Sequence, residues 1–507
     1  MANPIFSKRA FFIVLLLAII GYLLRVRVAE WSFNSTLLDL FPDLNEIGFF
    51  SSSDMPAKEL MEKGAKPKHP VILIPGIISS SLELWAGRDC SMSFLRQRIW
   101  GSVTMLRFML VDPKCWFEHL KLKNGSDPDD IRLRPSSGLD AADYVLPGYW
   151  VWGRIIENMA LFGYDPSNLY MAAYDWRLGF DKQEERDFYF TKLKASIELA
   201  YTLTNQKVVI ISHSMGSLLF HYFMNWIKSK KGKNEPDWCS KYIHSYVNIA
   251  GPLLGAPKTV STVVSGEARE TVQLGTVEAY IMNYFFSLKE RTNLFRTWGG
   301  LMSLLPKGGS AIWGNHNLIE LEWDTTHNQK KEFTMDDTHK ALEFFLPSES
   351  FSLASKYSLS SEIDSDDPSK WSNPLESSLP HAPDMKIYCL YGLGLQTEIG
   401  YKYRMDQDYR VKEFVHADGD GSVPEISLGY MCKEGWKSNE LNPSQIKVTT
   451  REYLHSPTSK VRDIRGGPDT GDHVDILGNR KLILDLLTIV SDFEQLENSL
   501  LADSNSD

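Results

Sequence analysis

Residues 207–216, KVVIISHSMG, decide the fold of this chain. Residues 208–211 are β-branched and apolar, as in a buried parallel strand, and apolar residues then recur at helical spacing from Leu218 to Trp226. Between them, SHSMG at 212–216 has the form of the G-x-S-x-G turn that raises a nucleophilic serine above a sheet. Ser212 replaces the first glycine, and it is small enough for a sharp turn that crowds this position. A serine-rich loop without chemistry has the same local sequence, so the partners of Ser214 must decide between the two interpretations.

Strands and helices alternate around this turn. Besides 208–211, the predicted strands are VILIPG at 71–76, 243–249, MKIYCLYGLG at 385–394 and EFVHA at 413–417, and helices are predicted between several of them. Alternation of this kind predicts a mainly parallel sheet with right-handed crossovers. Together with the serine turn, it predicts an α/β-hydrolase fold carrying cap or lid insertions.

The chain divides by composition into a short N-terminal region, a connector, one α/β domain and a tail. We expect these parts at residues 1–29, 30–68, 69–490 and 491–507. Insertions are expected at about 79–148 and 256–380, and within the second the serine-rich, acidic stretch 348–379 predicts a disordered surface loop. The last helix is expected from Val474 to about Leu487, beside His473.

The apolar run AFFIVLLLAIIGYLL at 10–24 predicts an N-terminal membrane anchor helix. It is short against the ~20 residues that cross a bilayer, but arginines on its flank can snorkel to the interface. A cleaved signal peptide is the alternative, although no A-x-A-like cleavage site follows. Basic residues on both sides leave the orientation undecided.

Composition excludes some functions and leaves others open. A hydrophobic share of 43% builds a sizeable core, and a net charge of −10 argues against binding nucleic acid. Five cysteines suit two disulfides and one free thiol, or isolated buried thiols, and without a CxxC or Cys/His cluster we expect no metal. Asn34 and Asn124 begin glycosylation sequons, which matter if the body of the protein is lumenal.

A serine hydroxyl becomes a nucleophile when a histidine removes its proton and a carboxylate orients that histidine. In this fold the chain order is Ser, Asp or Glu, then His. The loop DGDG offers Asp418 and Asp420, and we prefer Asp420 because glycines flank it on both sides. Two histidines follow, His455 and His473, and His473 is favoured because it lies in a glycine-containing loop.

Acyl transfer also needs two backbone N–H groups for the oxygen that becomes negatively charged. One should belong to Met215, the residue after the nucleophile, and the other to Ile77, in the loop after the first core strand. His213 projects the wrong way from the turn to act as the base of Ser214.

Several longer stretches resemble the lecithin:cholesterol acyltransferase family, and most closely its phospholipid:diacylglycerol acyltransferase branch. The resemblance runs from about residue 70 to 490. It is carried by VILIPGIISSSLELW, SGLDAADYVLPGYWVWG, MAAYDWRL, SHSMGSLLFHYFMNWI, PDWCSKYI, NIAGPLLGAPK, LLPKGGSAIWG, YCLYGLG, DGDGSVPEISLGYMC and GDHVDILGN.

The resemblance implies site residues. The family nucleophile, acid and base match Ser214, Asp420 and His473, and the oxyanion donors match Ile77 and Met215. The family's two disulfides match Cys90–Cys115 and Cys389–Cys432, which leaves Cys239 unpaired. Four further residues match a stretch beside the active site, where a network that only holds the loop is equally consistent: Tyr174, Asp175, Trp176 and Arg177.

The resemblance also implies a reaction and a location. The expected enzyme needs no cofactor and moves an acyl chain from a phospholipid donor to diacylglycerol, giving triacylglycerol and lysophospholipid. A phospholipase A or a phospholipid:sterol acyltransferase would use the same triad, and an inactive lipid-binding scaffold is a third alternative. The expected location is the endoplasmic reticulum membrane, with a single N-terminal anchor and a lumenal catalytic domain.

Overall fold

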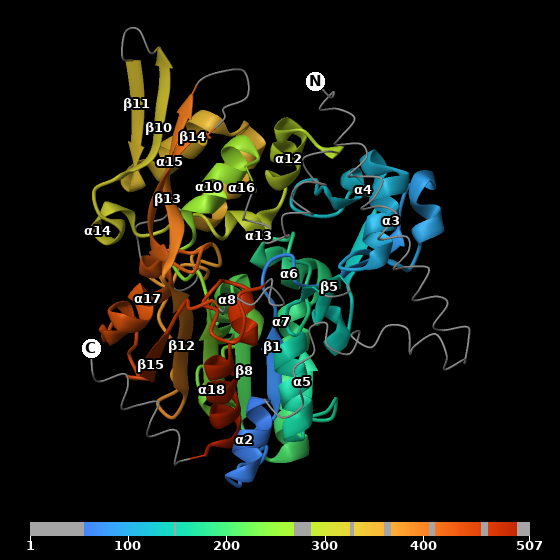
Figure 1. Ribbon diagram of the computed structural model, residues 1–507, viewed down its shortest axis with the longest axis vertical. Helices are drawn as coiled ribbons and strands as arrows, with labels where there is room; N and C mark the ends of the chain where they lie inside the picture. The colour runs from blue at the N-terminus through green and yellow to red at the C-terminus, as the bar shows by residue number, and fades with distance from the viewer. Residues whose placement is uncertain are drawn as a thin grey trace, which may run out of the picture. The chain divides into compact units, whose positions relative to one another are not determined.

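The computed structural model describes most of the chain after its N-terminal region (Figure 1). The described residues are 55–146, 149–267, 285–324, 329–358, 367–404, 411–457 and 465–493. The anchor expected at 10–24, the sequon at Asn34 and the tail from 494 lie outside them. Within the described ranges, no helix has the length and apolar character that crossing a membrane requires.

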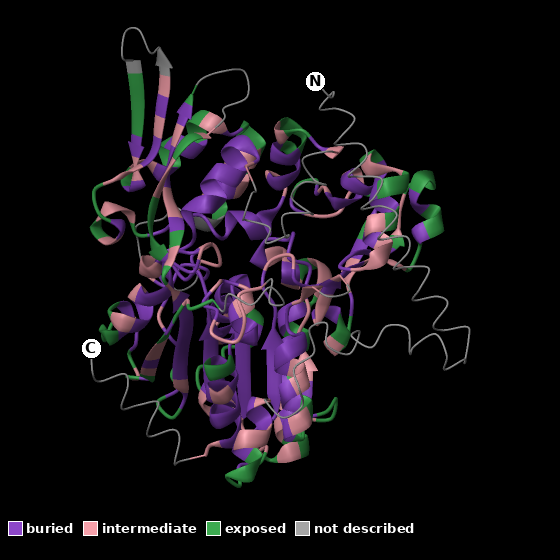
Figure 2. Ribbon diagram, in the orientation of Figure 1, coloured by how far each residue is buried: buried purple, intermediate pink, exposed green. Residues whose placement is uncertain are grey.

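The core is a six-stranded sheet in the order β15-β12-β9-β8-β1-β7. Every neighbouring pair in it is parallel, which confirms the predicted mainly parallel sheet. Its central strands are buried along their whole length because helices lie over them, and Figure 2 shows this buried interior. The strands are β1 (Val71–Ile74), β7 (Leu169–Met171), β8 (Val208–His213), β9 (Ile243–Ile249), β12 (Lys386–Leu393) and β15 (Lys447–Leu454).

The helices around this sheet follow the predicted alternation. Helix α8 packs on β8 and β1, and α7 packs on β8. Two more helices, α5 and α6, precede them in the chain. The bounds of the four are α5 (Gly153–Phe162), α6 (Phe180–Asp187), α7 (Tyr189–Thr204) and α8 (Met215–Lys228).

The connector predicted at 30–68 is partly wrong. Helix α2 (Pro56–Glu62) packs against α5 and against α18 (Arg480–Ser491) and belongs to the folded body. Ala57 and Leu60, which are fully buried, hold it there. Two small apolar side chains on one face suffice for a two-turn helix, and the polar composition of the segment hides them.

The insertion at 79–148 forms a separate small layer. Its three-stranded antiparallel sheet has the order β3-β2-β4, and a disulfide between Cys90 and Cys115 joins its 3₁₀ turn to α4. The elements are β2 (Leu82–Ala86), β3 (Arg98–Trp100), α3 (Val103–Val111), α4 (Pro113–Leu120), β4 (Arg132–Pro135), and β5 (Tyr144–Leu146), which pairs with β6 (Tyr149–Trp150) just beyond it.

The second insertion lies beyond the carboxyl ends of the central strands, together with the hairpin that follows β12 (Figure 1). A four-stranded sheet in the order β11-β10-β13-β14 unites the two. The elements are α10 (Pro257–Ser265), α12 (Leu288–Phe295), α13 (Gly299–Met302), α14 (Gly309–Trp313), β10 (Asn317–Asp324), β11 (Gln329–Thr334), α15 (Thr338–Phe345), β13 (Leu395–Arg404) and β14 (Val411–Gly419).

The serine-rich stretch 348–379 is not a disordered loop where the structure describes it. Ser348–Ser358 form helix α16, and Ala354 on that helix is fully buried. Trp371 is 1% exposed and packs against Tyr222 of α8. A few apolar anchors spaced through polar sequence therefore order this stretch, and composition alone could not reveal them.

The end of the domain also differs from expectation. A 3₁₀ turn over Asp475–Gly478 follows His473, and α18 begins only at Arg480. Asn479 caps α18, because its side chain accepts the backbone N–H groups of Lys481 and Leu482. His473 thus lies in a loop before the turn rather than at the start of the helix.

Candidate active site

Ser214 lies between the end of β8 and the start of α8, as the sequence predicts for the serine turn. Its backbone has φ 53° and ψ −129°, a left-handed conformation that costs a residue other than glycine about 1–3 kcal/mol. The Ser214 N–H donates to the carbonyl oxygen of Ile249, at the end of β9, over 2.9 Å. The neighbouring strand therefore helps to hold the strained residue at the carboxyl edge of the sheet.

The two small residues of the turn have separate reasons to be small. A Cβ added to Gly216 would lie 2.5 Å from the carbonyl oxygen of Pro75, so only glycine fits there. The Ser212 hydroxyl is hydrogen-bonded to the Ser217 hydroxyl over 2.9 Å and donates to the carbonyl of Val247 over 3.1 Å. The structure accommodates serine in place of the usual glycine because the extra hydroxyl is fully satisfied.

Asp420, His473 and Ser214 form one hydrogen-bonded line. His473 Nε2 lies 2.9 Å from Ser214 Oγ, and His473 Nδ1 lies 2.6 Å from Asp420 Oδ2. The other carboxylate oxygen of Asp420 accepts the backbone N–H groups of Ser422 and Val423 at 3.0 and 2.7 Å. These donors fix the Asp420 carboxylate with one oxygen left for the imidazole.

The structure distinguishes the alternatives that the sequence left open. Asp418 is exposed and accepts the N–H groups of Gly394 and Gly419, so it shapes the turn without reaching His473. His455 accepts the N–H of Gly471 over 3.1 Å and so supports the loop that carries His473.

The backbone of His473 is held at both of its polar groups. Its N–H donates to the Asp420 carbonyl over 3.0 Å, and its carbonyl accepts from His213 Nε2 at 2.7 Å. Burial lowers the pKa of His213 to about 3, so this imidazole is neutral and carries its proton on Nε2. His213 thus directs its Nε2 at the backbone of His473 and holds the loop that carries His473.

Ile77 lies in the loop after β1, and Met215 directly follows Ser214 in the chain. Met215 begins α8, where the first N–H groups of a helix have no intrahelical acceptor. Within the described ranges, neither the Ile77 nor the Met215 N–H donates to a protein acceptor. A Cβ on Gly76 would lie 2.9 Å from Ser214 Cβ, so this glycine lets the loop of Ile77 approach the serine closely.

A partly open cavity meets the Ser214–His473 pair, and both side chains line its wall. Lys258 of α10 adds a cation to its wall, buried at 4% exposure, and donates to the carbonyl of Gly421 over 3.3 Å. The rest of the wall is mostly apolar and comes from both insertions and the core, including Ile77, Val145, Val151, Leu301, Leu304, Val423 and Val474. The arrangement suits an acyl chain with its ester at Ser214.

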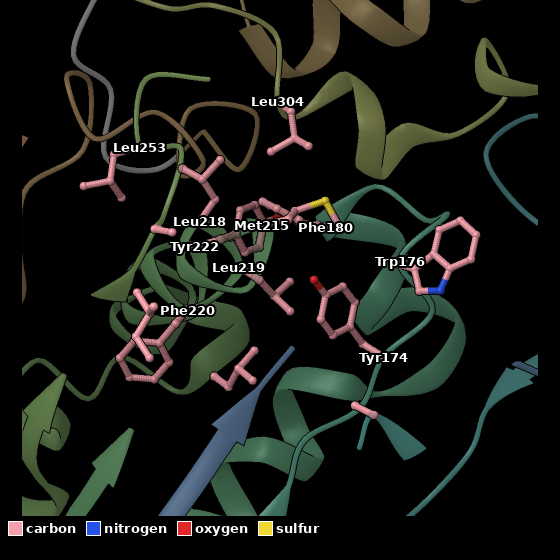
Figure 3. Close-up of a cluster of buried hydrophobic side chains, with 14 of the residues drawn as sticks. Tyr174, Trp176, Phe180, Met215, Leu218, Leu219, Phe220, Tyr222, Leu253 and Leu304 are labelled. Carbon is pink, nitrogen blue, oxygen red and sulfur yellow. The ribbon is translucent and has the colours of Figure 1, made fainter. Parts of the chain in front are cut away.

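Tyr174 and Trp176 lie behind the cavity wall rather than in it. In Figure 3, Tyr174 is directed towards side chains of α8, and Trp176 lies farther from α8 than Tyr174 does. Trp176 Nε1 donates to the carbonyl of Ser80 over 2.9 Å, in the loop after β1.

Asp175 and Arg177 belong to a buried ionic network. Arg177 contacts both Asp175 and Asp127, and Arg186 bridges the same two carboxylates. Burial alone would raise the pKa of Asp175, but the two guanidiniums outweigh it and hold that pKa below its ordinary value. Because Asp127 belongs to the first insertion, the network ties that insertion to the core.

The remaining cysteines follow the pattern that the resemblance implied. A disulfide joins Cys389 of β12 to Cys432 of α17 (Glu425–Lys433), and Cys239 is free and buried. Burial raises the pKa of the Cys239 thiol to about 12, which keeps it unreactive. Asn124 is exposed in a turn, and its glycosylation stays a prediction.

Two side-chain groups in the described part of the chain have donors close enough for a metal. One contains the Cys90–Cys115 disulfide, whose sulfurs are bonded to each other. The other joins His69, His244 and Asp492 at the amino ends of β1 and β9, away from Ser214. The two imidazoles of this group are stacked with their ring centres 3.8 Å apart.

Sequence reasoning missed three features of this site: the bond from His213 to His473, the partners Asp127 and Arg186, and the cation of Lys258. These features depend on contacts between separate segments of the chain, and no local sequence pattern predicts such contacts. The AYDWR stretch, with two opposite charges in an apolar context, was the nearest signal for the ionic network.

The chain was compared with known protein families and curated proteins. The family model "Lecithin:cholesterol acyltransferase" matches residues 94–480. Phospholipid:diacylglycerol acyltransferase of Schizosaccharomyces pombe is 41% identical over 465 residues, covering 84% of this chain and 73% of that protein. The protein of the same name in Saccharomyces cerevisiae is 38% identical over 475 residues, covering 85% and 72%. Phospholipid:diacylglycerol acyltransferase 1 of Arabidopsis thaliana is 34% identical over 556 residues, covering 86% and 82%. The chain therefore belongs to the lecithin:cholesterol acyltransferase family.

Proposed function

We propose that this protein is a phospholipid:diacylglycerol O-acyltransferase that works through an acyl-serine on Ser214. The observation that carries the proposal is the line Asp420–His473–Ser214, which ends in an apolar cavity. The names of the relatives that share 34–41% of their residues supply the donor and acceptor classes.

The first half of the reaction transfers the acyl group to the enzyme. Ser214 Oγ attacks the ester carbonyl of the phospholipid while His473 Nε2 takes the hydroxyl proton. The N–H groups of Ile77 and Met215 bind the oxygen that becomes negative. The ester C–O bond then breaks, His473 returns its proton to the leaving oxygen, and lysophospholipid departs.

The second half repeats these steps with another alcohol. His473 takes the proton of the diacylglycerol hydroxyl, whose oxygen attacks the acyl-serine carbonyl. Triacylglycerol forms, and Ser214 recovers its proton from His473. The reaction exchanges one ester for another, so it requires neither acyl-CoA nor another energy source. The side chains of Ser214 and His473 carry every proton transfer.

Diacylglycerol must compete with water for the acyl-serine. The mostly apolar cavity wall, to which α10 and α13 of the second insertion contribute, lowers the access of water to Ser214. A bilayer that supplies diacylglycerol at high local concentration favours the alcohol further.

The first insertion supports docking on a bilayer. Its surface carries apolar side chains that are between 40% and 69% exposed, namely Trp85, Met92, Leu95, Leu110 and Val111. A membrane is the partner that this reaction requires, and these exposed apolar side chains are available to contact it.

We place the enzyme in the endoplasmic reticulum membrane, with one N-terminal anchor at 10–24 and a lumenal body. The two disulfides and the sequons at Asn34 and Asn124 support an oxidising lumen. Deglycosylation should shift the mobility of the protein from cells, and the shift should disappear in the Asn34→Gln, Asn124→Gln double variant. A signal peptide cleaved after residue 24 would contradict the anchor, and N-terminal sequencing detects it.

The acyl acceptor is tested with purified protein on vesicles of phosphatidylethanolamine labelled in the sn-2 acyl chain, with equal amounts of diacylglycerol and sterol. Label in triacylglycerol, lost in Ser214→Ala, is the expected result. Label only in fatty acid would identify a phospholipase A, and label only in steryl ester would identify a sterol acyltransferase. Product formation by folded Ser214→Ala would contradict the nucleophile, and no product from the folded wild type would favour the lipid-binding scaffold.

A further inference from the structure

The loop after β1, residues 75–81, holds an unusual backbone conformation next to the proposed oxyanion donor. Ile78 has φ 58°, in the left-handed region, where a β-branched side chain crowds its own backbone. Ile78 follows Ile77 directly, and a return of Ile78 to an ordinary negative φ would rotate the chain that carries the Ile77 N–H. The position of this donor therefore depends on whatever keeps Ile78 strained.

Two indoles hold this loop by its carbonyl oxygens. Trp100 Nε1 donates to the carbonyl of Ile78 over 2.8 Å, and Trp176 Nε1 donates to the carbonyl of Ser80 over 2.9 Å. Trp100 and Trp176 are 4% and 0% exposed, and their rings lie 5.0 Å apart. Both donors act in an interior from which water is excluded, where a hydrogen bond gains strength and a lost one is costly.

The two indoles come from different parts of the molecule. Trp100 ends β3 of the first insertion, whereas Trp176 follows β7 of the central sheet. Trp176 also packs edge-on against Trp298 at 4.9 Å. The loop is thus held from outside the strand that it follows, by rings that are themselves fixed in the core.

We infer that Trp100 and Trp176 are positioning residues for acyl transfer: by holding the carbonyls of Ile78 and Ser80, they keep the Ile77 N–H directed at the site of the oxyanion. This inference rests on the proposed function, in which Ile77 is an oxyanion donor. Neither indole touches the substrate, so their loss changes the rate of the chemical step and leaves substrate binding largely unaltered.

The chain contains a matched control for Trp100. Trp116 is also buried, stacks on Trp100 at 6.2 Å, and donates to the carbonyl of Ile99 over 2.8 Å. Its bond has the same length and chemistry but ends on β3 instead of the loop after β1. Replacing either indole by phenylalanine removes one ring and one N–H from the same cluster.

The experiment compares Trp100→Phe, Trp176→Phe and Trp116→Phe in the full-length protein. Steady-state kinetics of acyl transfer give kcat and KM. A second assay measures the rate at which a lipid fluorophosphonate modifies Ser214, since formation of that adduct also needs the oxyanion donors. We expect Trp100→Phe and Trp176→Phe to lower kcat and the modification rate by about tenfold to a hundredfold, with KM within about twofold. Trp116→Phe should stay within about threefold of the wild type in both rates.

A general packing effect would give a different pattern. Equal losses in the Trp100→Phe and Trp116→Phe proteins, or an unchanged modification rate in folded Trp100→Phe, would overturn the inference. If Trp100→Phe does not fold, benzothienylalanine at position 100 keeps two fused rings without the N–H, and it must show the same loss. The modification rate is read at Ser214 whatever the acceptor, so a failure of the proposed transfer to diacylglycerol leaves this comparison intact.

Discussion

The serine turn and the loops of its two partners are built in different ways. Ser214 is held by short-range structure: β8 leads into it, α8 leads out of it, and Ile249 of the adjacent strand accepts its N–H. His473 is held by bonds between distant segments, to Asp420 and from His213, whereas Asp420 combines its bond to His473 with bonds from Ser422 and Val423 in its own turn. The β13–β14 hairpin leaves the central sheet after β12 and returns at Gly419, where the next residue, Asp420, pairs with Leu395.

The serine turn and the loops of its partners therefore differ in how much change they allow. The turn allows little change at Gly216, because the carbonyl oxygens of Pro75 and Ile74 lie against that position. The loops that carry Asp420 and His473 can follow long insertions, provided that the carboxylate and the imidazole still reach the same positions.

The largest effect should come from the acid. Asp420→Asn should lower kcat by about 10⁴-fold, because an amide cannot orient and stabilise the imidazolium of His473 as a carboxylate does. Asp418→Asn, in the same loop, should stay within about threefold, since Asp418 accepts the backbone N–H groups of Gly394 and Gly419 and does not reach His473. Steady-state transfer on vesicles measures both variants, and similar losses in the two would remove the assignment of Asp420.

Substitutions at the two small residues of the serine turn should differ in their effect on activity. Gly216→Ala places a methyl group against the carbonyls of Pro75 and Ile74, and we expect at least a tenfold loss of activity with about 1–3 kcal/mol of stability. Ser212→Gly should keep the activity within about threefold, because the turn needs only a small residue there. Fluorophosphonate labelling and urea unfolding provide the two readouts. An active, stable Gly216→Ala protein would show that the backbone around the turn is not rigid.

The bond from His213 to the His473 carbonyl should have a moderate effect. His213→Phe keeps a ring but loses the donor, and we expect about a tenfold lower kcat, equivalent to one buried hydrogen bond. His213→Gln offers an amide N–H in nearly the same place and should recover most of the loss. A rate that is unchanged in His213→Phe would mean that the loop of His473 is held by its other contacts alone.

A further effect, on stability instead of rate, should appear in the pH dependence of unfolding. Burial lowers the pKa of both His213 and His221 to about 3, so the folded protein keeps them neutral while the unfolded chain protonates them below about pH 6.5. The folded state therefore loses stability as the pH falls below 6.5, by about 2 kcal/mol for each histidine at pH 5. Urea unfolding at pH 7 and pH 5 measures the loss, and His221→Gln should reduce it. The same loss in His221→Gln as in the wild type would contradict the burial of a neutral His221.

The comparison also explains what could be predicted from the sequence. Strand β8, the serine turn and α8 are continuous in the chain, so the pattern of residues 207–226 is enough to predict all three. The alternation of strands and helices along the chain predicts the parallel sheet. Asp420 and His473 were reachable because chain order and glycine-rich loops left few candidates. Trp100, Asp127 and His213 act through contacts across 22 to 260 residues, for which a single sequence has no local pattern. The helix over Ser348–Ser358 was missed because its polar composition outweighs its few buried anchors.

The central claim is that the acyl chain passes through Ser214, and trapping the intermediate tests it most directly. The protein is incubated with phospholipid vesicles lacking diacylglycerol, quenched in acid and digested, and its peptides are weighed by mass spectrometry. The account predicts one acyl chain on the peptide containing Ser214, its absence in Ser214→Ala, and its transfer to triacylglycerol when diacylglycerol is added before the quench. An acyl chain on a different residue, or transfer to diacylglycerol by folded Ser214→Ala, would contradict it.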